Sequence, residues 1–174
     1  MKLQTRMLSL ATLGSLLLSA CTSVPVQLQG EYSNLNPKAA ARKDVGTRVR
    51  WGGVLLETHP EADHTCFEIL SRELQSSMRP VESDEANGRF IACKAGFYDP
   101  EVFVKGREVT VTGTLVRIDR RKVGNYDYTY PVVKADFISL WPKRREVIYR
   151  EPMIPFSPYY WYYPYPYYFY RYPF

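Results

Sequence analysis

Short runs of alternating hydrophobic and polar residues follow one another between residues 47 and 141, with glycine, proline and other turn residues between them. The clearest run lies in residues 109–115, where Val109, Val111 and Leu115 fall on one side with Gly113 and three threonines fall on the other. A period of two residues is typical of a half-buried β-strand. Since no amphipathic helical pattern longer than two turns interrupts these runs, the sequence predicts an all-β domain.

Five strands are expected in this region, over residues 47–57, 65–69, 89–93, 109–115 and 130–141. The pair Gly52 and Gly53 in the first strand predicts a bulge or a sharp bend. Between the third and fourth strands, Asp99 followed by Pro100 predicts a short helical turn. In the fifth strand, Val133, Ala135 and Phe137 are expected on one face. This succession predicts a small five-stranded Greek-key barrel of the OB type, with a small β-sandwich as the alternative.

The first 20 residues have the pattern of a signal peptide. Lys2 and Arg6 supply a positive start, and residues 7–18 form a short apolar run that is closed by small residues. A helix that spans a bilayer needs about 20 apolar residues, so this run predicts export and cleavage instead of a permanent membrane span.

The segment from Leu18 to Cys21 resembles the bacterial lipobox, in which the cysteine becomes the lipidated N-terminal residue. The alternative is an ordinary secretory signal beside a coincidental cysteine. Because no aspartate follows Cys21, the known sorting rules of lipoproteins imply an outer-membrane location, with the domain facing the periplasm. Residues 21–46 lack a sustained period and are predicted to be the lipidated N-terminus and a tether. The OB-like domain is assigned to residues 47–150.

Two further cysteines, Cys66 and Cys93, lie inside the second and third predicted strands. If these strands form an antiparallel hairpin, residues whose numbers sum to about 159 face each other, and the two sulfurs then meet. In an oxidising compartment this geometry predicts a disulfide. A metal site that includes His59 and His64 is the weaker alternative, because neither cysteine has a CxxC partner.

Charge and motifs exclude several functions. Removing residues 1–20 takes away two basic residues and no acidic residue, so the net charge falls from +5 to +3, which does not indicate nucleic-acid binding. The basic clusters at residues 117–122 and 143–145 are interpreted as solvated surface, with contact to acidic lipid head groups as the alternative. No nucleophile, metal-protease, P-loop or dinucleotide motif occurs. We therefore expect no catalytic residue, no metal and no cofactor.

Residues 151–174 form an aromatic tail, in which residues 156–174 contain 13 aromatic residues and four prolines. The prolines favour extended structure. Tyrosine and tryptophan suit a membrane interface, and they also suit a partner protein or a glycan. The plainest alternative is a low-complexity segment without a fixed structure. The candidate contact residues are Tyr159, Tyr160, Trp161, Tyr162, Tyr163, Tyr165, Tyr167 and Tyr168.

Several segments have a distinctive pattern: the lipobox, residues 49–53 (VRWGG), residues 96–100 (GFYDP) with 106–114 (GREVTVTGT), and residues 128–131 (YTYP) leading into Trp141. Together they resemble the Slp family, the starvation-inducible outer-membrane lipoproteins of Gram-negative bacteria. The resemblance implies an outer-membrane lipoprotein linked to envelope or stationary-phase stress, and it brings no catalytic residue. The cysteine pair and the aromatic tail are expected to depart from the family.

The predicted function is therefore that of a structural or binding component of the cell envelope, anchored in outer-membrane lipid. One alternative is a module that binds a small ligand or an oligosaccharide on the open face of the barrel. Another is an accessory subunit that docks through its aromatic tail on an envelope protein.

Overall fold

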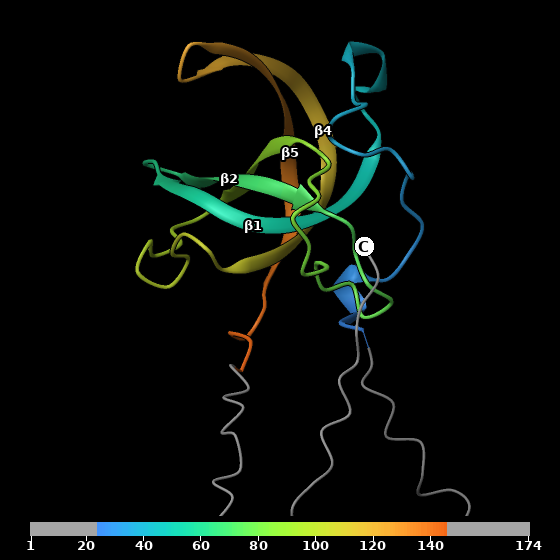
Figure 1. Ribbon diagram of the computed structural model, residues 1–174, viewed down its shortest axis with the longest axis vertical. Coiled ribbons are helices and arrows are strands. Elements are labelled where there is room, and N and C mark those ends of the chain that lie inside the picture. Colours follow the sequence, from blue (N-terminus) through green and yellow to red (C-terminus); the bar gives the residue numbers. More distant parts are fainter. Residues whose placement is uncertain (1–23, 146–174) are drawn as a thin grey trace, which may run out of the picture. The chain divides into compact units, whose positions relative to one another are not determined.

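Five strands close into a barrel in the computed structural model, which describes residues 24–145 (Figure 1). Their order around the barrel is β1-β2-β3-β5-β4, and β3 pairs with β5 in parallel while the other neighbours are antiparallel. The predicted OB-like barrel is confirmed, and the β-sandwich alternative is wrong because a single sheet closes on itself. The strands are β1 (Arg48–Pro60), β2 (His64–Arg72), β3 (Arg89–Ala95), β4 (Glu108–Val123) and β5 (Tyr126–Leu140).

The barrel interior is filled by residues at alternate positions of the strands. In β2 every second side chain is buried, and Phe67 and Ile69 belong to this inner set. Trp51 of β1 meets Phe90 of β3 edge to face, with ring centroids 5.2 Å apart. The alternation predicted for β4 is confirmed on its inner side, where Val109, Val111 and Leu115 are buried.

The glycine pair of β1 allows close packing of strands, and the predicted bulge lies elsewhere. A Cβ at Gly53 would stand 1.9 Å from the carbonyl oxygen of Leu70. The ladders from β1 to both neighbours continue unbroken through Gly52 and Gly53, and the register against β2 shifts only between Leu55 and Glu57. Gly53 is therefore needed because β2 approaches the β1 backbone at this point, whereas a Cβ at Gly52 would meet the Leu74 side chain and the Val109 carbonyl oxygen of β4.

A second irregularity lies in β5, and because of it the face predicted for this strand is wrong at Phe137. Val133 and Ala135 point into the core as expected, but the register against β4 shifts where Thr112 pairs with Phe137 and Gly113 pairs with Ala135. Because β5 has one extra residue here, the side chains that follow it exchange their inward and outward positions. Ile138 and Leu140 consequently pack on the core in place of Phe137.

Residues 24–46 lie against the barrel, in contrast to the tether predicted for residues 21–46. This segment, here called the arm, contains two short 3₁₀ turns, η2 (Val26–Leu28) and η3 (Arg42–Asp44). Leu28 is fully buried, and the Trp51 indole donates to the carbonyl oxygen of Leu35 at 2.6 Å. On the outer side of β4, Thr110 and Thr112 are buried as well.

The predicted turn between β3 and β4 is a single turn capped by Asp99. The amides of Val102 and Phe103 donate to the Asp99 carbonyl oxygen, and the amide of Glu101 donates to Asp99 Oδ1 at 2.9 Å. The turn places Phe103 against Phe67, with ring centroids 5.2 Å apart. Asp99 thus acts as a cap, in agreement with the sequence analysis.

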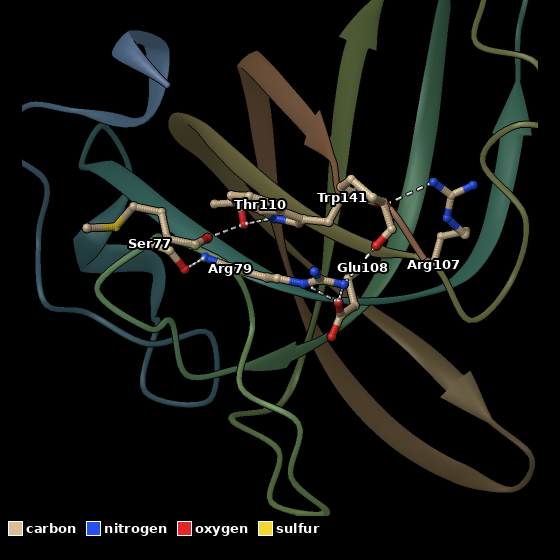
Figure 2. A network of polar contacts seen from close by, with 8 residues as sticks. Ser77, Arg79, Arg107, Glu108, Thr110 and Trp141 are labelled. Carbon is tan, nitrogen blue, oxygen red and sulfur yellow. Dashed lines mark hydrogen bonds and ion pairs between the residues drawn. The ribbon is translucent and has the colours of Figure 1, made fainter. Parts of the chain in front are cut away.

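A polar network holds the end of β5 to the start of β4 (Figure 2). Arg79 pairs with Glu108 at 2.6 Å and donates to the carbonyl oxygen of Pro142 at 2.8 Å. Trp141 donates its indole hydrogen to Thr110, and its carbonyl oxygen accepts from Arg107. Within residues 24–145 no helix is long and apolar enough to cross a membrane.

Candidate functional site

The outer side of β2, β3 and β5 carries a second group of buried and aromatic side chains. Phe90 and Ala92 of β3 point into the core, so their neighbours Arg89 and Ile91 point to the opposite side. Ile91, Tyr130 and Val132 are buried together on that side. We call this surface the tyrosine face and define it by Glu68, Arg89, Ile91, Tyr126, Tyr128, Tyr130 and Val132, together with the pair Cys66 and Cys93.

Cys66 and Cys93 form a disulfide on this face. They pair directly in the antiparallel ladder between β2 and β3, whose register sums to the predicted 159. His64 lies close to both sulfurs, with its ring nitrogen and the two Sγ atoms within 4.8 Å of one another. Because both sulfurs are used in the disulfide, they offer no thiolate to a metal ion in this state.

A charged triad lies next to the disulfide. Glu68 accepts hydrogen bonds at one carboxylate oxygen from Arg89 Nη1 at 3.0 Å and from the Tyr130 hydroxyl at 2.8 Å. Burial, and then the hydrogen bond to Glu68, raise the pKa of Tyr130. Burial lowers the pKa of Arg89, but the hydrogen bonds to Tyr130 and Glu68 outweigh it and leave that pKa raised. The triad therefore keeps the arginine charged and in a fixed position.

Three tyrosines continue outward from the triad along β5. Tyr130, Tyr128 and Tyr126 occupy alternate positions, with successive ring centroids 5.2 Å and 6.3 Å apart. The Arg89 guanidinium lies 5.9 Å from the centre of the Tyr128 ring. Tyr126 ends the series with 70% of its surface exposed.

The outer tyrosines border a cleft of about 220 Å³. Lys38 of the arm, Arg89, Asp127 and Thr129 supply polar groups to it, while Tyr126 and Tyr128 supply aromatic rings. Aromatic rings beside a few hydrogen-bonding groups suit a ligand that has both an apolar surface and hydroxyl groups, such as a sugar. In OB-folds, the face of strands 2 and 3 with the loop between strands 4 and 5 binds oligonucleotides or oligosaccharides.

The residues predicted from the sequence fall into two groups. Cys66 and Cys93 are brought together on the tyrosine face, whereas Cys21 and the aromatic tail lie outside the described residues. Glu68, Arg89 and Tyr126 were not among the site residues predicted from the sequence. Tyrosines at positions 126, 128 and 130 were the available signal, because alternate residues of one strand share a face.

The fold and this face define a small OB-like barrel domain with one aromatic outer surface. The sequence profile described as "Outer membrane lipoprotein Slp family" matches residues 18–168, and the chain belongs to this family. The outer membrane of Gram-negative bacteria is thus its location. The match begins with the lipobox and extends into the aromatic tail as far as residue 168.

Three relatives are similar over most of their length. An uncharacterised protein of Haemophilus influenzae is 35% identical over 71% of this chain and 70% of its own. The uncharacterised lipoprotein YeaY of Escherichia coli is 30% identical over 86% and 77%, and the outer membrane protein Slp of the same organism is 27% identical over 76% and 73%.

Among solved structures, the small single-stranded DNA-binding protein of Streptomyces coelicolor is similar, with a TM-score of 0.38 and 13% identity. It covers 55% of this chain and 94% of its own. The assignment of the fold does not depend on this similarity, because the strand order and the parallel β3–β5 pairing establish it.

Proposed function

We propose that the chain is a lipid-anchored binding component of the envelope, with the anchor on Cys21 and the barrel facing the periplasm. The family match supports this proposal, since it begins at Leu18 and so includes the complete lipobox. A thiol is needed to carry the lipid thioether, and Cys66 and Cys93 are used in the disulfide. Of the three cysteines, Cys21 is therefore the one for the anchor. The tail tyrosines remain a predicted contact.

Replacing Cys21 by alanine is expected to abolish lipid modification and to release the protein from the outer membrane. The measurement is intact mass together with membrane fractionation, for the native chain and the variant side by side. Thr22→Ala is the matched control, because it changes a neighbouring residue and leaves the thiol in place. Native protein without a lipid-sized mass increment would contradict the anchor.

The tyrosine face supports oligosaccharide binding as a second candidate function. The main evidence for this function is the series of alternate tyrosines, which ends in the exposed Tyr126 beside a polar cleft. The triad of Glu68, Arg89 and Tyr130 fixes the inner end of this series, so that the outer rings are held ready for a ligand. Such preorganisation lowers the entropic cost of binding.

Soluble glycan strands released from peptidoglycan are the probe for this second function. Tyr126→Ala is expected to weaken their binding about two- to tenfold, since stacking on one aromatic ring contributes roughly 0.5–1.5 kcal/mol. Calorimetric titration of the mature chain measures the affinity. Phe97→Ala is the matched control, because Phe97 is 71% exposed on the loop between β3 and β4 and lies outside the tyrosine face. Equal losses in the two variants, or no binding by the native chain, would reject a saccharide role.

A further inference from the structure

A second cleft lies where the arm crosses β1 and β2, apart from the tyrosine face. Its volume is about 350 Å³, within the range of small-molecule sites. The arm supplies residues 32–37 to its wall, and the barrel supplies residues 50–52 and 71–74 together with Asn87. Two arginines, Arg50 and Arg72, face this cleft, and Glu73 is the one acidic residue among its described lining residues.

The register of the sheet explains why both arginines reach the same place. Gly52 of β1 pairs with Arg72 of β2, and Arg50 lies two residues before Gly52 on the same strand. Residues two apart on a strand share a face, and paired residues share it too. Trp51 between them points into the core, so Arg50 and Arg72 both point outward.

The charge of Arg72 has no partner in the part of the chain that the structure describes. Its Nε, like that of Arg107, is buried without a hydrogen bond to a described residue, and no described carboxylate lies within ion-pair distance of Arg72, although Glu82 and Asp84 share a neighbouring hollow with it. The half-buried Arg79 and Arg89 differ in this respect, since each pairs with a glutamate at 2.6–3.0 Å. Leaving a partly buried donor unpaired is unfavourable.

Arg50 adds a second positive charge that no described carboxylate neutralises. Its guanidinium lies 4.9 Å from the centre of the Tyr32 ring, and its Nη1 donates to the carbonyl oxygen of Leu28 at 2.8 Å. These contacts fix the guanidinium in place and leave its charge uncompensated. The side-chain amides of Asn34 and Asn87 at the cleft can donate further hydrogen bonds.

We propose that this cleft binds a phosphate group, held by Arg50 and Arg72 and by the neighbouring asparagine amides. The planar guanidinium group matches phosphate oxygens in geometry and binds them with charge-assisted hydrogen bonds. The phosphate can come from a lipid head group or from a soluble phosphorylated molecule, and both present the same anionic oxygens. The assignment is independent of the tyrosine face, which lies on other residues.

The test uses the full mature chain with Cys21→Ala, so that an acyl chain does not dominate membrane binding. In the first arm, the Nε–Hε NMR signal of Arg72 is followed during titration with potassium phosphate, against potassium chloride at equal ionic strength. In the second arm, the chain is sedimented with phosphatidylcholine vesicles that contain or lack phosphatidic acid. We expect a saturable shift of the Arg72 signal with phosphate but not with chloride.

Arg72→Gln is expected to lower the affinity for phosphate at least tenfold, whereas Arg120→Gln, the same change of charge on the exposed part of β4, leaves it unchanged. Binding to the phosphatidic acid vesicles as well identifies a head group as the source, and a response to phosphate alone identifies a soluble ligand. Absence of a saturable response in both arms, or equal affinities of Arg72→Gln and native chain, overturns the proposal.

A second readout separates ligand binding from a structural role of Arg72. Phosphate is expected to raise the melting temperature of the native chain by mass action and to leave that of Arg72→Gln unchanged. In chloride, the variant is expected to melt no lower than the native chain, because the guanidinium loses no partner. Arg72 only supports the fold if the variant has a lower melting temperature than the native chain in chloride and if phosphate raises both melting temperatures equally.

Discussion

Replacing Gly53 by alanine is expected to destabilise the barrel by about 3 kcal/mol or more, a large part of the roughly 5–15 kcal/mol that stabilises a typical domain. The new methyl carbon would lie 1.9 Å from the carbonyl oxygen of Leu70, and backbone cannot rotate away as a side chain can. The ladder between β1 and β2 would have to open near the end where Gly53 pairs with Ser71. Equilibrium denaturation by guanidinium, followed by tryptophan fluorescence, measures the change.

Gly124→Ala is the control for this prediction. Gly124 has a φ of 59° in the turn between β4 and β5, and nothing lies within 4 Å of a Cβ placed there. Its replacement brings only the backbone penalty of a left-handed residue, about 1 kcal/mol. Equal destabilisation by the two substitutions would mean that strand approach at Gly53 is not the cause.

Replacing Phe67 by alanine is expected to lower the free energy of unfolding by about 3–5 kcal/mol. Phe67 is fully buried and contacts the rings of Tyr98 and Phe103, with centroids 5.6 Å and 5.2 Å away. Its loss leaves a cavity and also frees the turn capped by Asp99. The amides of Val102 and Phe103 should therefore exchange faster with solvent than in the native chain.

Phe97→Ala supplies the comparison for Phe67, since both changes remove a phenylalanine ring near the same turn. Phe97 is largely exposed, so its replacement should change stability by less than about 0.5 kcal/mol. Denaturation and hydrogen exchange of the two variants check the prediction together. A Phe67→Ala chain within 1 kcal/mol of the native one, with unchanged exchange at Val102, would place this ring outside the core.

The parts of the fold that depend on local patterns could be predicted from the sequence. Alternation in residues 109–115 identified the inner side of β4, and the spacing of Cys66 and Cys93 set the register between β2 and β3. Asp99 was identified as a cap because an aspartate before a proline begins a turn through its own side chain. Each of these signals acts over a few residues or within one hairpin.

Features that depend on the opposing strand could not be predicted. The shifts at Leu55 and at Phe137 place an extra residue in one strand, and only the partner strand decides where it fits. The arm was missed for a different reason. Its hydrogen bonds to the barrel, such as that from Trp51 to Leu35, use backbone carbonyls, which every residue has.

The candidate sites differ in the same way. Three alternate tyrosines on β5 are visible in the sequence, and a prediction that gave weight to shared faces would have found them. The arm cleft has no such signal, because Arg50 and Arg72 differ from the paired arginines only in lacking a carboxylate partner among the described residues. That property appears only when all neighbouring charges have positions in space.

The packing of the arm would limit how far the barrel can move from the anchor proposed on Cys21. Residue 24, where the described arm begins, is three residues after Cys21, and three residues span at most about 11 Å. With a lipid on Cys21, the start of the folded domain is confined to the layer of water next to the bilayer. A domain held in this way would meet other molecules by lateral diffusion in two dimensions, and it would sample what lies at the membrane surface far more often than what is dissolved in the bulk.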